Sequence, residues 1–149
     1  MKAMALPFIM TTPVKPIPVA HNERPNVLVV DDDATILDLI TRLLSHLGLG
    51  VLGAASGEEA LAVYQECPEQ ISAVISDFNM PGINGLELCV ELRDMNPDLP
   101  AMIVSGNLSD QLLDAIRACH YEVLPKPFTF DQFNNALPKL LPEHYLAKR

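Results

Sequence analysis

The stretch NVLVVDDDATILDLITRLLSHLG, residues 26–48, decides the fold. It opens with a short, largely apolar and β-branched run, which predicts a buried strand over residues 26–30. After three aspartates, apolar residues recur at helical spacing, and Gly48 stands where a helix commonly ends. These apolar residues are Ile36, Leu37, Ile40, Leu43, Leu44 and Leu47. The stretch therefore predicts a strand followed directly by a helix.

The same alternation continues along the chain. Further strands are predicted over residues 49–55, 71–77, 100–106 and 121–125, and further helices over 57–67, 85–96, 108–120 and 128–140. Five short strands that alternate with five helices predict an α/β protein with a doubly wound, five-stranded parallel sheet. Helices cover both faces of the sheet in this (βα)5 arrangement, which makes it a three-layer sandwich.

Composition divides the chain into three parts. Residues 1–25 carry five of the 13 prolines, and proline removes backbone donors and disfavours helix in the residue before it. We therefore expect a proline-rich flexible tail or linker over residues 1–25, a folded domain over 26–141 and a C-terminal tail over 142–149. A linker in this place suggests a further domain upstream in a longer protein.

Charge and hydropathy exclude several classes of function. Ten basic against 19 acidic residues give a net charge of −9, and no Lys/Arg-rich run occurs, so we expect no direct contact with nucleic acid. No apolar run reaches the roughly 18–20 residues of a membrane span, and Pro7 interrupts the N-terminal apolar stretch, so we expect a cytoplasmic protein. The three cysteines lack metal-ligand spacing, which predicts small buried or half-buried thiols.

Polar residues stand at the carboxyl ends of four predicted strands. Three aspartates, Asp31 to Asp33, follow the first strand, and Asp77 ends the third. Ser105 ends the fourth strand, and Lys126-Pro127 follows the fifth. Because the carboxyl ends of parallel strands share one edge, where such sheets bind ligands, we expect these side chains to lie together. The opposite edge carries no comparable set.

The residue types in this set suit phosphoryl transfer. Several carboxylates at one edge favour a divalent cation, and oxygen ligands without Cys or His favour Mg²⁺. A carboxylate beside Mg²⁺ can attack phosphorus while the metal, a lysine and a hydroxyl neutralise the phosphoryl oxygens. Each residue also has a simpler interpretation. Asp33 suits the N-cap of the first helix, Asp77 a turn, and Lys126 an exposed loop, but their joint position favours the site.

Four segments of the chain resemble the signature blocks of response-regulator receiver domains of the chemotaxis-regulator type, which act in two-component signalling. They are VLVVDDD (27–33), VISDFNMPGINGLEL (74–88), MIVSG (102–106) and LPKPF (124–128). The resemblance spans roughly residues 26–141, and the blocks together are far more specific than any one of them. It implies a flavodoxin-like form of the predicted sandwich.

The resemblance also implies a role for each site residue. Asp77 would be the phosphoacceptor, and Asp31 and Asp32 would be the acidic pair beside it. Ser105 and Lys126 would contact the phosphoryl group, and Lys126-Pro127 would be a cis peptide. Mg²⁺ would be held by Asp32, Asp77 and the backbone carbonyl of Asn79, with Asp31 acting largely through water.

A receiver domain of this kind accepts its phosphoryl group from a histidine kinase or a histidine phosphotransfer protein. We expect it to signal through protein–protein contacts, as a stand-alone regulator or as the C-terminal receiver of a hybrid kinase. We expect no enzymatic activity beyond self-catalysed phosphoryl transfer and autodephosphorylation, and no output domain after Arg149. By analogy, the usual partner surface would include Leu108, Asp110, Gln111, Asp114 and Tyr121.

One departure from the family pattern concerns conformational change. Many members carry an aromatic residue three positions before the lysine, where this chain has Val123. An aromatic switch is therefore not expected, and any change would depend on Ser105 and the loop over residues 106–109. Ser105 itself stands where threonine is commoner, which keeps the hydroxyl and loses a methyl group.

The strongest alternative is a haloacid-dehalogenase-type phosphatase, which shares the fold class and Mg²⁺. Asp31, Asp33 and Thr35 fit its D-x-D-x-T opening, with Asp31 as the nucleophile and Asp33 as the general acid/base. Only Asp131 remains after Lys126 to serve as its later acidic motif, and that enzyme has no use for Asp77. A second alternative is a receiver domain that binds partners without being phosphorylated. It would leave unexplained why a suitable residue stands at every chemical position of the site. A histidine donor is not favoured, since the four histidines share no motif.

Overall fold

The structure, a computed structural model, describes residues 25–146. Its five strands are β2 (Asn26–Val30), β3 (Gly50–Ala54), β4 (Ile71–Asp77), β5 (Ala101–Ser105) and β6 (Glu122–Pro125). All neighbouring strands are parallel, in the order β3-β2-β4-β5-β6. The predicted five-stranded parallel sheet is therefore confirmed. The expected proline-rich tail lies, except for Pro25, outside the described residues.

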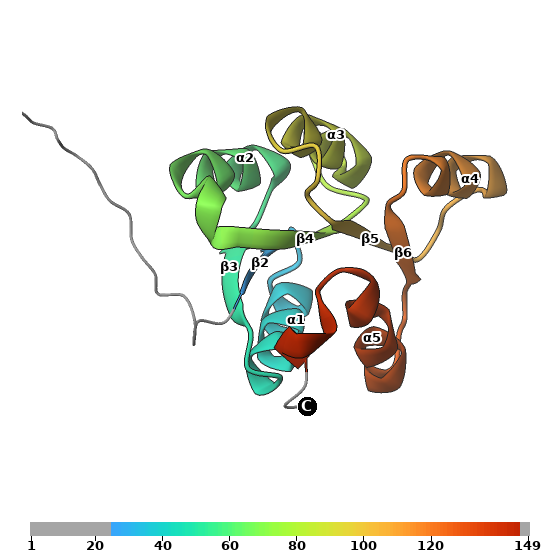
Figure 1. Ribbon diagram of the computed structural model, residues 1–149. Helices are drawn as coiled ribbons and strands as arrows, with labels where there is room; N and C mark the ends of the chain where they lie inside the picture. The colour runs from blue at the N-terminus through green and yellow to red at the C-terminus, as the bar shows by residue number, and fades with distance from the viewer. Residues whose placement is uncertain (1–24, 147–149) are drawn as a thin grey trace, which may run out of the picture.

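Five α-helices connect or follow the strands. They are α1 (Ala34–His46), α2 (Gly57–Glu66), α3 (Gly85–Met95), α4 (Asp110–Ala118) and α5 (Phe130–Ala136). In Figure 1, α1 and α5 lie below the sheet and α2, α3 and α4 lie above it, which gives the predicted three layers. No helix among the described residues is long and apolar enough to cross a membrane.

Each face of the sheet has its own hydrophobic core. Along β2, Val27 and Val29 pack into the cluster that contains Phe133, while Leu28 and Val30 pack into the cluster that contains Leu92. This alternation follows from the period of two residues along a strand, and it explains why a central strand must be apolar on both faces. The two cores hold β2 and β4 rigidly, and the site lies at the carboxyl ends of these strands.

Caps determine where the helices begin. The Asp33 side chain accepts a hydrogen bond from Thr35 N at 2.9 Å, which confirms the predicted N-cap of α1. Thr129 and Gln132 form a capping box at the start of α5. Helix α4 is shorter than predicted, because Ser109 caps it at Leu112 N. These capping bonds satisfy backbone donors that a helix start leaves unpaired.

Three short 3-10 helices were not predicted as such. They are η3 (Pro68–Gln70), η4 (Leu137–Lys139) and η5 (Glu143–Leu146). The helix predicted over residues 128–140 divides into α5 and η4 because Pro138 lacks the N–H that would continue the α-helical bonding. Residues 142–149 were expected to be a tail, but Leu146 is only 2% exposed and packs against the α1–α5 core.

Candidate phosphoryl-transfer site

The site lies at the point where strand order reverses. The chain runs from β2 outward to β3 and then returns to β4 on the other side of β2, so the carboxyl ends of β2 and β4 are neighbours. Val30 lies opposite Ser76 in the register, which places the next residues, Asp31 and Asp77, side by side. Parallel sheets bind ligands at this position. The predicted edge is therefore where the acidic residues meet.

A lysine that directly follows the last strand closes this acidic pair. Lys126 Nζ donates to Asp77 Oδ1 at 3.0 Å and lies 3.4 Å from Asp31 Oδ2. Asp31 is 2% exposed and Asp77 8% exposed, whereas the Lys126 side chain is half-buried. Two buried carboxylates share one ammonium, so the group carries a net negative charge that a cation can balance.

The electrostatics of the pair follow from burial and proximity. Burial raises the pKa of Asp31 above its ordinary value; the Asp33 N–H opposes the rise, the charge of Asp77 adds to it, and Lys126 opposes it. Burial alone would lower the pKa of Lys126, but its hydrogen bond to Asp77 and the two carboxylate charges outweigh burial and raise that pKa. Lys126 is therefore a fixed positive charge at neutral pH.

Asp31, Asp32 and Asp77 could hold a metal ion. Each offers a carboxylate oxygen, and the three oxygens lie within 4.8 Å of one another. Asp31 and Asp77 are buried, while Asp32 is exposed and faces the site from the solvent side. An all-oxygen donor set with part of its shell open to water suits Mg²⁺, which keeps several waters when bound. The residues present therefore fit a hard divalent cation.

Ser105 and Pro127 lie beside this group. Val104 is paired with Asp77 in the register, so Ser105 follows one residue beyond the acidic position, and it is 5% exposed. Its Oγ accepts a long hydrogen bond from Asn107 N at 3.4 Å, and its carbonyl accepts one from Lys126 N at 3.0 Å. The Lys126–Pro127 peptide is cis. Asn79, whose carbonyl was expected to bind the metal, lies two residues after Asp77 and is exposed.

The loop after Asp77 is held by residues that sequence reasoning missed. Gly85, the first residue of α3, lies against the backbone of Asp77, where a Cβ would overlap the Asp77 carbonyl oxygen. Glu58, in the first turn of α2, accepts a hydrogen bond from Ile83 N at 3.4 Å. Asn84 and Glu87 form a capping box at the start of α3. The Asn84-Gly85 pair and the acidic residue Glu58 are visible in the sequence, but their contacts with this loop are not.

An apolar hollow adjoins the site. It has a volume of about 380 Å³ and is lined by Ile36 and Leu39 of α1 and by Lys126, Pro127 and Phe128. Lys126 thus lies between the acidic pair and an apolar surface, on which Leu39 is 43% exposed. The hollow therefore places exposed apolar surface directly beside the charged site.

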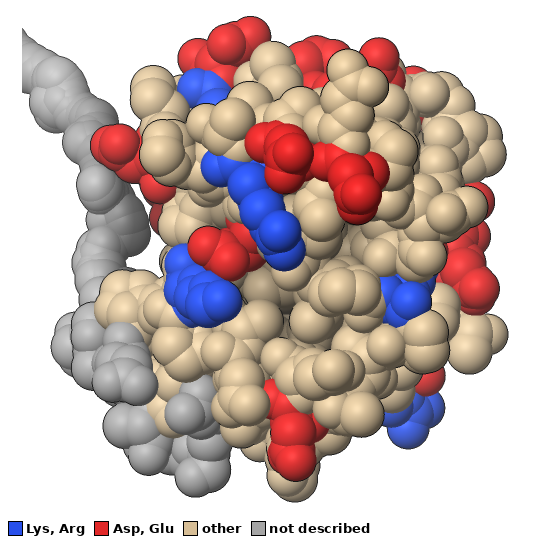
Figure 2. Space-filling model, turned by 90° about the vertical axis from the view of Figure 1, so that its right-hand side faces the viewer, with Lys and Arg blue, Asp and Glu red and all other residues tan. Residues whose placement is uncertain are grey.

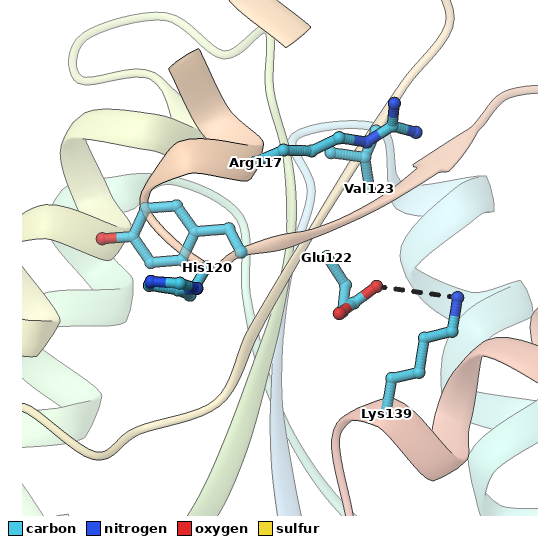
Figure 3. A pocket seen from close by; sticks show the side chains of 6 residues that line it. Arg117, His120, Glu122, Val123 and Lys139 are labelled. Atoms are coloured by element: carbon cyan, nitrogen blue, oxygen red, sulfur yellow. Dashed lines mark ion pairs between the residues drawn. The ribbon is translucent and has the colours of Figure 1, made fainter. Parts of the chain in front are cut away.

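A second hollow, of about 460 Å³, lies at the β6 edge and is lined by Arg117, His120, Tyr121, Glu122, Val123 and Lys139. Figure 3 shows Arg117 and Val123 on one side of this hollow and the ion pair of Lys139 with Glu122, whose atoms are 3.9 Å apart, on the other. Figure 2, which faces this edge, shows basic and acidic side chains interspersed around it. It contains neither of the buried aspartates and is separate from the acidic site.

The cysteines were expected to be buried or half-buried, and two of them are. Cys89 is buried and Cys67 half-buried, and burial raises the pKa of the Cys89 thiol to about 12. Cys119 is exposed, which corrects the prediction for that residue. It follows the end of α4, where the helix surface meets solvent.

Comparisons with known proteins agree with this geometry. A family model described as the response regulator receiver domain matches residues 27–138. The sensor kinase CckA of Brucella abortus is 34% identical over 116 residues, which are 77% of this chain and 12% of that protein. The response regulator MprA of Mycolicibacterium vanbaalenii is also 34% identical over 116 residues, covering 77% of this chain and 49% of that protein. The chain spans half or less of the length of these curated relatives.

Solved structures give the same result. The chemotaxis protein CheY4 of Vibrio cholerae has a TM-score of 0.73 at 29% identity and covers 80% of this chain and 100% of its own. The receiver domain of the hybrid histidine kinase CckA has a TM-score of 0.65 at 31% identity and covers 78% of this chain and 99% of its own.

Proposed function

Because the chain belongs to the response regulator receiver domain family of two-component signalling, we propose that Asp77 is the residue that accepts the phosphoryl group. The observation that carries this proposal is the position of the Asp77 carboxylate. It lies at the carboxyl end of the central strand β4, bonded to Lys126 at 3.0 Å and within reach of the Asp31 and Asp32 oxygens. Asp31 also contacts Lys126, at 3.4 Å, and belongs to the same group of oxygens, so the experiment below compares the two residues.

In the proposed reaction an oxygen of Asp77 attacks the phosphorus atom of a phosphohistidine. The O–P bond forms as the P–N bond breaks, and the electron pair of the broken bond stays on the histidine nitrogen of the donor. Lys126 stays charged and offsets the negative charge that Asp77 and the phosphoryl oxygens bring together. Ser105 would donate its hydroxyl to one phosphoryl oxygen.

We propose that Mg²⁺ binds to Asp32, Asp77 and the backbone carbonyl of Asn79, with Asp31 acting largely through water. Bound there, the ion supplies positive charge that neutralises phosphoryl oxygens. Asp31 is buried and hydrogen-bonded to Asp33 N at 2.8 Å, so its carboxylate is held in one orientation toward the site. Asp32 is exposed and can adjust to the ion.

The donor we propose is a histidine kinase or a histidine phosphotransfer protein, docked on the apolar hollow beside Lys126. The hollow shares Lys126 with the site, so a partner that covers Leu39 and Phe128 brings its own surface next to Asp77. An amphipathic helix with apolar side chains around its phosphohistidine fits this surface. Replacing Leu39 with Ser should slow transfer from such a protein about tenfold and leave transfer from acetyl phosphate unchanged.

We propose self-catalysed phosphoryl transfer and autodephosphorylation as the only chemistry, with output through protein contacts and without direct contact with nucleic acid. A cytoplasmic location agrees with the unpaired thiols of the three cysteines. The chain would act as a stand-alone regulator or as the receiver of a hybrid kinase. The phosphatase alternative has no support in the comparisons, and its general acid/base, Asp33, is the N-cap of α1.

The test is incubation with Mg²⁺ and acetyl phosphate, followed by intact-mass measurement of wild type, Asp77→Ala and Asp31→Ala. We expect a Mg²⁺-dependent gain of one phosphoryl group in wild type that Asp77→Ala abolishes. Catalytic hydrolysis of the donor that survives Asp77→Ala and disappears in Asp31→Ala would establish the phosphatase instead.

A further inference from the structure

We propose that Glu58 of α2 is a positioning residue for the metal site, because it holds the loop whose Asn79 carbonyl is proposed to bind Mg²⁺. This role rests on the proposed function of Asp77 and deepens it, since it adds a side chain from a neighbouring helix to the support of the same site. It follows from the contacts of Glu58, from the packing of Ile83 on the start of α2, and from the way the loop is held at its two ends.

The loop over residues 78–84 joins β4 to α3 and is fixed at both ends. Gly85 N donates to Phe78 O at 2.8 Å, which brings the two ends of the loop together. The capping box of Asn84 and Glu87 holds its last residue on the first turn of α3. These contacts fix the ends of the loop and leave its middle to be held by other residues.

Glu58 holds the middle of the loop. It lies in the first turn of α2, which lies beside α3 on the same face of the sheet (Figure 1). Its Oε2 accepts a hydrogen bond from Ile83 N at 3.4 Å, and within residues 25–146 this is the one hydrogen bond that residues 79–83 form. The carboxylate also lies against Gly82, where a Cβ would be 2.6 Å from Glu58 Oε2 and 3.1 Å from Oε1. One carboxylate thus contacts two neighbouring residues of the loop.

The side chain of Ile83 adds an apolar contact with the same helix. A Cβ at Gly57, the first residue of α2, would overlap Ile83 Cγ1 and lie 2.7 Å from Ile83 Cδ1, so the Ile83 side chain lies directly against the helix. Ile83 is half-buried and also packs against the core on the α2–α3 side of the sheet. Gly82, at a φ of 81°, turns the chain just before this contact, in a conformation that glycine adopts readily. The loop is therefore held on α2 by one polar and one apolar contact.

A backbone carbonyl that binds a metal depends on such support. Asn79 O has no side-chain torsions, so its direction is set by the φ and ψ angles of the loop. Mg²⁺ demands near-octahedral geometry with short bonds, and groups that orient its ligands raise its affinity without touching the ion. Asn79 lies between Asp77, which β4 fixes, and Ile83, which Glu58 fixes. Loss of the Glu58 contact should therefore weaken metal binding.

Glu59 is the matched control, because it carries the same charge in the same helical turn. Its Oε1 accepts a hydrogen bond from Ala55 N at 2.8 Å, so it supports the start of its own helix and not the loop. Glu58 and Glu59 are both exposed, so replacing either one should leave the protein folded. A comparison of the two residues separates loss of the loop contact from loss of charge or of helix stability.

Calorimetric titration of the metal-free full chain with Mg²⁺ alone measures the effect. Glu58→Ala should weaken Mg²⁺ binding about tenfold. Glu58→Gln should stay within about twofold of wild type, because its amide oxygen still accepts the Ile83 N–H. Glu59→Ala should also stay within about twofold, because solvent and salt screen an exposed charge. Unchanged affinity in Glu58→Ala, or equal losses in Glu58→Ala and Glu58→Gln, would overturn the positioning role.

Exchange of the Ile83 amide proton with water, followed by NMR in EDTA, gives a readout that does not depend on metal. This proton should exchange about tenfold faster in Glu58→Ala than in wild type, because it loses its acceptor. Glu59→Ala should match wild type at Ile83 and exchange faster at Ala55. An Ile83 rate that Glu58→Ala leaves unchanged would show that Glu58 does not hold the loop.

Asp77→Asn in the same titration separates this role from the proposed function. Mg²⁺ binding that Asp77→Asn weakens and Glu58→Ala leaves intact would overturn the role of Glu58 alone. Mg²⁺ binding that Asp77→Asn leaves unchanged would overturn the proposed metal site and the role of Glu58 together.

Discussion

Gly85→Ala should destabilise the protein although it introduces a better helix former. A Cβ at residue 85 would overlap the Asp77 carbonyl oxygen and lie 3.0 Å from Phe78 Cα and 3.1 Å from Asp77 C. Because non-bonded heavy atoms pack at about 3.5–4.0 Å, and these neighbours are backbone atoms, α3 or Asp77 must move on the order of 1 Å. Replacing glycine in a helix gains up to about 1 kcal/mol, whereas overpacking costs about 3 kcal/mol.

The expected net loss is therefore about 2 kcal/mol in the free energy of unfolding, or roughly 5–10 °C in melting temperature. Urea and thermal unfolding followed by circular dichroism measure it. Because Asp77 is displaced, phosphorylation by acetyl phosphate should slow by about 10- to 100-fold, read as intact mass against time.

Gly53→Ala is the matched control. A Cβ at Gly53 would lie 3.6 Å from Leu37 Cδ1, which is an ordinary contact. The free energy of unfolding of the Gly53→Ala protein should stay within about 0.5 kcal/mol of wild type or rise, and its phosphorylation rate should not change. A Gly85→Ala protein as stable and as rapidly phosphorylated as wild type would refute the steric reasoning.

Three further predictions concern the charged residues. Asp31→Asn, measured without metal, should raise the melting temperature at pH 7: the folded-state pKa of Asp31 is raised, so its charged form opposes folding. That gain should disappear as pH falls below 3.8, the ordinary pKa of an aspartate, because Asp31 is then protonated in the folded and in the unfolded state. A gain that does not depend on pH would contradict the raised pKa of Asp31. Asp33→Ala should cost about 1 kcal/mol in urea unfolding through loss of the α1 cap, with phosphorylation unaffected; loss of phosphorylation would show a chemical role for Asp33. Lys126→Met should lower the free energy of unfolding in EDTA by about 2–3 kcal/mol, because Asp31 and Asp77 lose their shared cation. Mg²⁺ should recover part of that loss, as measured by thermal unfolding. Unchanged stability would mean that the two carboxylates need no counter-charge.

The local sequence pattern predicted a strand or helix well where the apolar run had a clear first and last residue. β2 and β4 were predicted with their observed bounds, because the apolar run of each strand ends at an aspartate. The position of Asp31 beside Asp77 followed from parallel topology, since register then brings strand ends together. The Asp33 cap followed from its place before the first helical turn.

What could not be predicted depends on contacts between distant residues. Arg93 and Cys119 are 26 residues apart, and nothing near either in the sequence indicates their hydrogen bond. The same holds for Glu58 and Ile83, which are 25 residues apart. Leu146 lies in a stretch too short to show periodicity, yet it is buried by packing against the α1–α5 core. Such contacts depend on how the folded chain brings distant residues together, and the local sequence does not indicate this.

The most direct test of the central claim is to identify the phosphorylated residue chemically. Wild-type protein treated with Mg²⁺ and acetyl phosphate would be reduced with borohydride, which converts an aspartyl phosphate to homoserine, and its peptides sequenced by mass spectrometry. Our account predicts homoserine at position 77 and unmodified aspartate at positions 31, 32 and 33. Homoserine at position 31 with residue 77 unmodified would contradict it.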